Sequence, residues 1–188
     1  MKRMLASVVA AGVMLTAAER PVAAQMVASP VRFGITGGAA IPVGNLSDFV
    51  KSGWTAGALL DIGLPLVPVG FRIDGTWTQF SDKDLPGGGT GKERIIAGTA
   101  DLVYALNSLA MTKFYLIGGI GVYNVKAERT DLILGSGTAT DTKFGINAGA
   151  GVRVQLTGFS TFVEARWHDV FTQGSDPKMV PITVGITF

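Results

Sequence analysis

The stretch KFGINAGAGVRVQL, residues 143–156, decides the fold of this chain of 188 residues. Apolar residues occupy every second position in it: Phe144, Ile146, Ala148, Ala150, Val152, Val154 and Leu156. The positions between them carry small or polar residues: Lys143, Gly145, Asn147, Gly149, Gly151, Arg153 and Gln155. Because side chains alternate between the two faces of a β-strand, this pattern predicts a strand with one apolar face and one small, polar face.

Seven further segments can be read in the same way, which predicts an all-β protein. The eight predicted strands are residues 31–43, 53–64, 69–80, 93–106, 113–126, 142–156, 160–170 and 179–188. The connections between them are alternately long (44–52, 81–92, 127–141, 171–178) and short (65–68, 107–112, 157–159). In the third long connection, residues 132–134 are either a contact patch or an extension of the flanking strand. This alternation is typical of an antiparallel up-and-down meander with loops at one rim and tight turns at the other.

The direction of the apolar faces distinguishes a membrane barrel from a soluble one. The mean hydropathy is +0.38, yet no run of 18 apolar residues is available to cross a bilayer as a helix. A closed barrel of eight strands has room inside only for side chains, which suits the many glycines of the polar faces. The apolar faces must then point outward into lipid. We therefore predict an eight-stranded antiparallel up-and-down transmembrane β-barrel; the alternative is a periplasmic lipocalin-like carrier with the faces inverted.

Charged residues on the polar faces predict the content of the lumen. Four arginines accompany four carboxylates there: Arg32, Asp61, Arg72, Asp74, Asp101, Arg153, Glu164 and Arg166. An isolated charge in a narrow lumen is costly, whereas an arginine can bind a carboxylate through two hydrogen bonds. We therefore predict a lumen charge network that plugs the barrel. The fifth strand is apolar on both faces, so its register stays open, and Phe162 on the polar face would either cap the lumen or mark a bulge.

Aromatic residues are expected to mark the two membrane interfaces as girdles. The girdle beside the long loops is expected to hold Trp54, Trp77, Phe80, Tyr123, Phe144, Trp167 and Phe171. The girdle beside the short turns is expected to hold Phe33, Phe71, Tyr104, Phe114, Tyr115 and Phe188. All three tryptophans of the chain therefore belong to one predicted rim.

The first 24 residues have the pattern of a secretory signal peptide. Lys2 and Arg3 precede an apolar stretch at residues 4–18, and a small-residue cleavage site ends at Ala24. The apolar stretch is short for the alternative, a membrane-anchoring helix. Cleavage would remove three of 16 basic and one of 14 acidic residues, which leaves a neutral chain. We predict a signal peptide at 1–24, a short N-terminal lead at 25–30, a barrel at 31–188, and no nucleic-acid partner.

These features together resemble the small bacterial outer-membrane β-barrel family, of the general kind of OmpX and the OmpA membrane domain. The segments GAAIPVGNLSDF, GFRIDGTWTQF and FVEARW are similar to members of that family. The resemblance covers nearly all of the mature chain and carries no catalytic signature. It implies localisation in the outer membrane of a Gram-negative-type envelope, with outer-membrane lipid as a partner.

The resemblance also implies a role for the last segment, PITVGITF, residues 181–188. Four apolar residues share one face of it: Ile182, Val184, Ile186 and Phe188. In this family such a strand is an assembly signal, which the barrel-assembly machinery reads through strand pairing. The alternative is an ordinary last strand, which would tolerate the loss of Phe188.

Two motifs suggest chemistry but match it poorly. In PGGGTGKE, Pro86 stands where a phosphate-binding loop needs glycine, and Glu93 where it needs Ser or Thr. His168, Asp169 and Ser175 suggest an enzyme acting on outer-leaflet lipid, but nothing in the chain enforces a triad. The chain has no cysteine. We predict no enzyme, no cofactor and no metal site.

The function predicted from the sequence is structural or one of surface interaction, through long extracellular loops whose partner the sequence does not specify. A narrow pore for small solutes is the main alternative, and the balanced charges of the lumen disfavour it. The carrier and the lipid-modifying enzyme are further alternatives.

Overall fold

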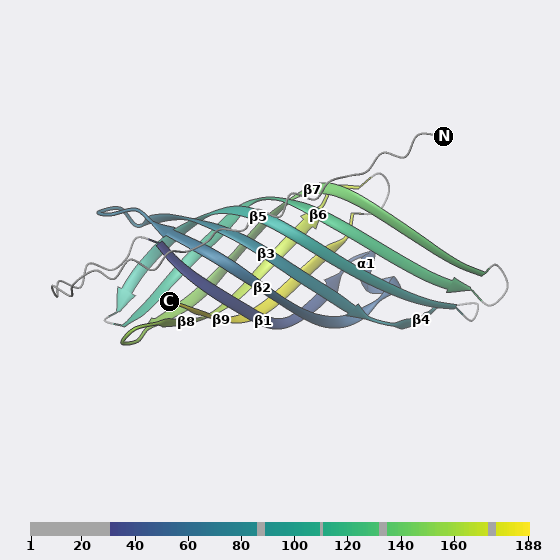
Figure 1. Cartoon of the computed structure of the whole chain (residues 1–188), viewed down its shortest axis with the longest axis horizontal. Helices are drawn as coiled ribbons and strands as arrows, with labels where there is room; N and C mark the ends of the chain where they lie inside the picture. The colour runs from purple at the N-terminus through teal and green to yellow at the C-terminus, as the bar shows by residue number, and fades with distance from the viewer. Residues whose placement is uncertain (1–30, 86–88, 110, 132–134, 173–175) are drawn as a thin grey trace, which may run out of the picture.

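The computed structural model describes residues 31–85, 89–109, 111–131, 135–172 and 176–188. These residues form a closed antiparallel β-barrel, which is drawn with its long axis horizontal in Figure 1. The predicted signal peptide and the predicted lead at 25–30 lie outside the described residues. In the described part of the chain, no helix is long and apolar enough to cross a membrane.

The wall of the barrel has eight strand positions, one of which β3 and the short β4 share. Its strands are β1 (Val31–Val43), β2 (Lys51–Gly63), β3 (Val69–Ser81), β4 (Lys83–Leu85), β5 (Gly89–Leu109), β6 (Thr112–Asp131), β7 (Gly135–Gln155), β8 (Ser160–Val170) and β9 (Lys178–Thr187). Each strand pairs with its neighbour in the order β3-β2-β1-β9-β8-β7-β6-β5, and pairing of β3 with β5 closes the barrel. The short β4 follows β3 at the same position in the wall and also pairs with β5. The predicted fold class is confirmed.

The two faces of the strands differ as the alternation predicts. On the outer face, Phe144 is 73% exposed, Ile120 67% and Val184 54%, and many other large apolar side chains are exposed there as well. On the inner face, charged residues such as Asp61, Arg72 and Glu164 are buried. An apolar exterior around a polar interior is the arrangement that lipid requires.

The structure resolves the register that the sequence leaves open. In β6, Tyr115, Ile117 and Tyr123 point into the barrel and are buried. Phe114, Leu116, Ile120 and Val122 are exposed on the outside. Phe162 lies opposite Arg153 in an uninterrupted register between β7 and β8, so no bulge displaces it.

The expected long loop at residues 127–141 is wrong. β6 and β7 continue into it from both sides, paired as far as Asp131 and Gly135, and β5 runs beside β6 as far as Thr90, so these three strands extend together past the end of β8 (Figure 1). Alternating threonines at 138, 140 and 142 favour strand structure, which outweighs the glycines of this stretch. Pairing of β7 with β8 begins only at Gly145, so the β6–β7 hairpin extends about 30 Å along its strands past that point.

The other long connections are also partly ordered. The connection at residues 81–92 contains β4 and the start of β5. The connection after β1 contains one turn of helix, α1 (Leu46–Phe49), with Leu46 and the following Val50 buried. These connections and the β6–β7 hairpin share one end of the barrel, which we call the loop end; the short turns form the turn end.

Candidate functional site

The centre of the lumen holds a chain of ion pairs, and Arg72 is its middle member. Its Nε donates to Asp61 Oδ1 at 2.6 Å and its Nη1 donates to Glu164 Oε2 at 2.8 Å. Arg153 donates from Nη2 to the other oxygen of Asp61. Arg72 is 1% exposed, and Asp61 and Glu164 are each 4% exposed, so the arginine and both of its carboxylate partners are held away from bulk water. These four charged groups compensate one another in the lumen, and removal of any one of them leaves an uncompensated buried charge.

Arg166 extends the same chain toward the loop end. Its Nε donates to Glu164 Oε1 at 3.0 Å, and its Nη1 donates to Asp74 at 3.1 Å and to Asp101 at 3.0 Å. Asp101 also accepts hydrogen bonds from Thr99 at 2.7 Å and from Asn147 at 2.6 Å. Seven of the eight predicted lumen charges are therefore joined in one network: Asp61, Arg72, Asp74, Asp101, Arg153, Glu164 and Arg166.

Arg32 is the predicted member that the structure leaves apart. It lies opposite Asp61 in the register of β1 and β2, but the oxygens of Asp61 are bound by Arg72 and Arg153. Among the described residues, no carboxylate lies within 4.0 Å of Arg32 to form an ion pair. Its Nε is buried and has no hydrogen-bond partner there. Competition for one carboxylate excludes Arg32 from the network.

The network ties opposite walls of the barrel together. Glu164 and Arg166 belong to β8, whereas Arg72 and Asp74 belong to β3. β3 is the fourth strand from β8 in either direction around the barrel. The pair of Asp61 on β2 and Arg153 on β7 is related in the same way. The ion pairs therefore cross the full width of the lumen.

Two aromatic rings cover the turn-end side of the network. Phe162 is 5.1 Å from Arg72 and 5.6 Å from Arg153, measured from ring centroid to guanidinium carbon. Tyr115 stacks on the same two arginines and donates its hydroxyl to Glu164 at 2.9 Å. A side chain on Gly185 would collide with the Phe162 ring, so glycine provides the space the ring fills.

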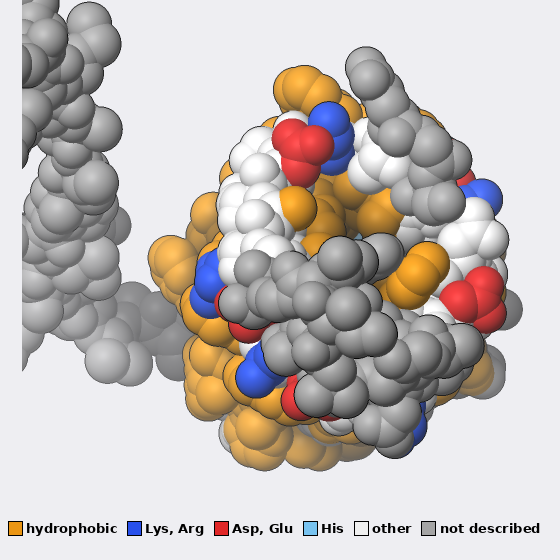
Figure 2. All heavy atoms as spheres, turned by 90° about the vertical axis from the view of Figure 1, so that its right-hand side faces the viewer, with side chains coloured by type: hydrophobic (Ala, Val, Ile, Leu, Met, Phe, Trp, Pro, Cys, Tyr) orange, Lys and Arg blue, Asp and Glu red, His pale blue; other side chains and the backbone are white. Residues whose placement is uncertain are grey.

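An apolar cluster fills the lumen near the loop end. It consists of Ala40, Leu46, Val50, Phe80, Ile95, Ala97, Tyr123, Val170 and Met179. Hydrophobic side chains are visible inside the opening when the barrel is viewed from this end (Figure 2). The expectation of a polar lumen is therefore wrong for this part. Three aromatic residues predicted in the girdles lie inside the barrel instead: Phe80 and Tyr123 near the loop end and Tyr115 near the turn end. Their buried aromatic area stabilises the packing there.

The space left between these layers is small. Between the ion-pair network and the apolar cluster lies a cavity of about 30 Å³, lined among others by Thr55, Thr78, Arg166 and His168. A cavity of that volume holds about two water molecules. Thr78 donates to Thr55 at 3.0 Å beside it. The described lumen thus offers little free volume along its middle.

The residues that suggested an enzyme are engaged separately. His168 Nδ1 lies 2.8 Å from the Tyr123 hydroxyl, and Asp169 lies 3.5 Å from Lys178 Nζ. Ser175 lies outside the described residues, as do Pro86 and the next two glycines of the PGGGTGKE motif. The remaining residues of that motif are part of β5. In the part of the chain that the structure describes, no cluster of His, Asp and Glu is placed to hold a metal ion.

The predicted girdle and assembly residues lie on the outer surface to different degrees. Trp54, Phe71, Trp77 and Tyr104 are exposed, and Trp167 is half-buried beneath Lys178, whose Nζ lies 5.9 Å from the ring centroid. The predicted assembly residues are all exposed on the outer face of the last strand and its end: Ile182, Val184, Ile186 and Phe188.

Comparison with known proteins agrees with this architecture. The sequence model of the outer membrane protein β-barrel domain matches residues 6–188. Neisserial surface protein A superposes with a TM-score of 0.62 at 15% identity, over 85% of this chain and 96% of the other. A major outer membrane protein of Thermus thermophilus gives 0.59 at 14% identity, over 84% and 98%. The N-terminal barrel domain of OprF from Pseudomonas aeruginosa gives 0.51 at 14% identity, over 84% and 97%. No curated protein matches the chain by sequence.

Proposed function

Because the chain belongs to the outer-membrane β-barrel family, we propose that it is a structural barrel of the outer membrane with a closed lumen and an interaction surface at its loop end. The observation that carries closure is the network of ion pairs that crosses the lumen from β2 and β3 to β7 and β8. The apolar cluster adds a second layer toward the loop end. Both layers lie in the path that a hydrated ion would take through the lumen.

Conductance in a planar bilayer tests the closed lumen. The mature protein, refolded and inserted, is expected to give no discrete current steps, because the middle of the lumen retains a cavity of only about 30 Å³. A general porin in the same bilayer is the positive control. Different gel mobility of boiled and unboiled samples checks that the inserted protein is a folded barrel. A steady open state of defined conductance would contradict closure and favour the alternative of a narrow pore.

The same contacts argue against the other two alternatives. A lipocalin-like carrier needs an apolar internal pocket, whereas the middle of this lumen is occupied by charged side chains. An enzyme acting on lipid needs a nucleophile beside its base, but His168 is engaged by Tyr123 and Asp169 forms an ion pair with Lys178. We therefore propose a non-enzymatic barrel.

We assign the interaction surface to the β6–β7 hairpin, because it extends, together with the start of β5, past the end of β8 and carries charges of both signs. Lys126 lies 2.5 Å from Glu128, and its hydrogen bond lowers the pKa of the Glu128 carboxyl. Lys143 lies 2.8 Å from Asp141 and lowers the pKa of that carboxyl in the same way. Both carboxyls thus stay ionised to lower pH than usual, and the hairpin keeps its charge pattern in mildly acidic surroundings.

Cysteine labelling in intact cells tests the direction of this surface. The chain has no native cysteine, so Thr140→Cys on the hairpin provides a single reactive thiol at an exposed position. A membrane-impermeant maleimide is expected to label it in intact cells. Thr157→Cys, in the exposed turn between β7 and β8, is the matched control and should be labelled only after the outer membrane is permeabilised. The reverse pattern would mean that the turn end faces outward.

The proposed partners follow from the same faces. Outer-membrane lipid covers the exposed apolar side chains of the wall. We assign recognition by the barrel-assembly machinery to the outer face of β9, where Val184 and Ile186 are exposed.

A further inference from the structure

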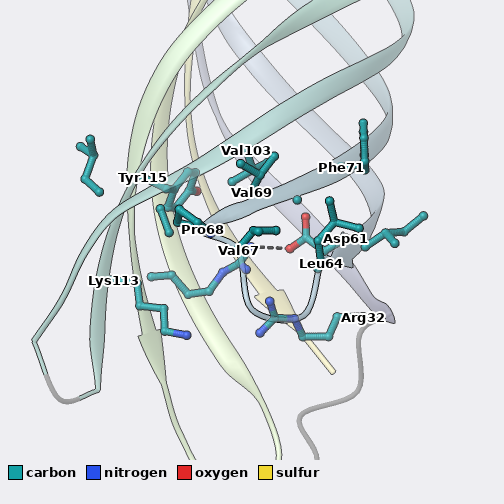
Figure 3. A pocket seen from close by; sticks show the side chains of 16 residues that line it. Arg32, Asp61, Leu64, Val67, Pro68, Val69, Phe71, Val103, Lys113 and Tyr115 are labelled. Atoms are coloured by element: carbon teal, nitrogen blue, oxygen red, sulfur yellow. Dashed lines mark hydrogen bonds and ion pairs between the residues drawn. The ribbon is translucent and has the colours of Figure 1, made fainter.

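A cavity of about 460 Å³ opens at the turn end of the barrel, on the other side of the ion-pair network from the apolar cluster. Figure 3 shows it from close by, with Val67, Val69 and Val103 forming an apolar wall and Arg32 and Lys113 beside it. We call this cavity the turn-end vestibule. Its volume is within the range of sites that bind small molecules.

Positive charge in the vestibule exceeds negative charge. Three cationic side chains line it, those of Arg32, Lys113 and Arg153, together with one carboxylate, that of Asp61. Asp61 accepts hydrogen bonds from Arg72 and Arg153, so its charge is already shared between two arginines. Arg32 and Lys113 have no ion pair within 4.0 Å among the residues with described positions. The flanking segments 25–30 and 107–110 contain no Asp or Glu that would supply one.

The arrangement of these cations is unfavourable without an anion. Lys113 and Arg153 lie directly opposite each other on β6 and β7, and like charges in that relation destabilise a sheet. The Nε atoms of Arg32 and Arg153 are buried and lack hydrogen-bond partners in the described structure. A buried donor without an acceptor costs free energy, which a bound anion would remove.

We propose that the turn-end vestibule is a binding site for a phosphate group. Phosphate offers several acceptor oxygens to the guanidinium groups of Arg32 and Arg153 and a negative charge to Lys113. The apolar wall beside these cations suits the carbon chain of a phospholipid, whose phosphodiester headgroup is one source of the group. A soluble phosphate or phosphate monoester is the other source. This inference does not depend on whether the lumen conducts, because the vestibule lies outside the closed part.

The first experiment measures binding by backbone-amide NMR of the refolded barrel in a non-ionic detergent. The two probes are inorganic phosphate and dihexanoyl phosphatidylglycerol below its micelle concentration, and dihexanoyl phosphatidylcholine is the zwitterionic control. We expect saturable shifts at Arg32, Lys113 and Arg153 with at least one anionic probe. Binding of the lipid alone identifies a headgroup site, binding of phosphate alone identifies a soluble ligand, and binding of neither overturns the proposal.

The second experiment removes the two cations that have no ion pair, with the double variant Arg32→Gln and Lys113→Gln. It should bind the effective probe about tenfold more weakly or worse, because two of three charged donors are lost. Without anion, it should unfold no earlier in denaturant than the wild type, since like-charge repulsion is relieved. The matched control is Lys51→Gln with Lys92→Gln, which removes two exposed cations far from the vestibule. Equal affinity of the double variant and the wild type would overturn the proposal.

Discussion

Replacing Arg72 with alanine is expected to lower the free energy of unfolding by about 3–5 kcal/mol. Arg72 is 1% exposed and bridges Asp61 and Glu164, so its removal leaves two carboxylates in the lumen with fewer partners. Breaking a buried ion pair from one side is costly because the remaining charge is uncompensated. Denaturant titration of the barrel in lipid vesicles measures the change.

Two variants control this prediction. Lys51→Ala removes an exposed cation from β2, and we expect a change within about 0.5 kcal/mol. Arg72→Lys keeps the charge but loses the bidentate contact with Asp61. Its decrease in the free energy of unfolding should therefore lie between those of Arg72→Ala and Lys51→Ala. A wild-type unfolding midpoint for Arg72→Ala would show that Arg72 contributes nothing to the network's stability.

Replacing Val184 with arginine is the second change with a large expected effect, a loss of about 2–4 kcal/mol in folding into lipid. Val184 is 54% exposed on the outer face of β9 and pairs with Gly37, the central residue of β1. A charge there must enter the hydrocarbon region of the bilayer. Folding titrations in vesicles, followed by the difference in gel mobility with and without boiling, measure the loss.

Val184→Leu is the matched control for this site, because it changes the size of the side chain and keeps it apolar. It should fold like the wild type within about 0.5 kcal/mol. If Val184→Arg also folded like the wild type, the outer face of β9 would not be in contact with hydrocarbon, and the assignment of the two faces would have to be reversed.

The strands and their faces could be predicted because alternation is a local property of the sequence. The pattern of residues 143–156 is enough to place Arg153 inside and Phe144 outside. The charges could be predicted to lie inside for the same reason, but their pairing could not. Arg32 faces the same carboxylate as two other arginines, and only the three-dimensional arrangement decides which of them binds it.

The content of the lumen near the loop end was harder to predict. Phe80 shares the face of Thr78 and Asp74, so the alternation did place it inside, but its position at a strand end suggested a girdle. Tyr123 belongs to a strand that is apolar on both faces, where alternation carries no information. The β6–β7 hairpin was missed because its glycines and polar residues are as typical of loops as of solvent-exposed strands.

The ion pairs that cross the lumen also bear on how fast the barrel comes apart. Asp61 with Arg153, Arg72 with Glu164, and Asp74 with Arg166 are each 92 residues apart in the chain. Contacts between strands on opposite sides of the barrel can form only when the sheet has closed into a barrel, so they are absent from earlier stages of folding. Interactions that form after the transition state slow unfolding and leave the folding rate nearly unchanged. We therefore expect the network to slow unfolding of the inserted barrel and to leave its folding rate nearly unchanged.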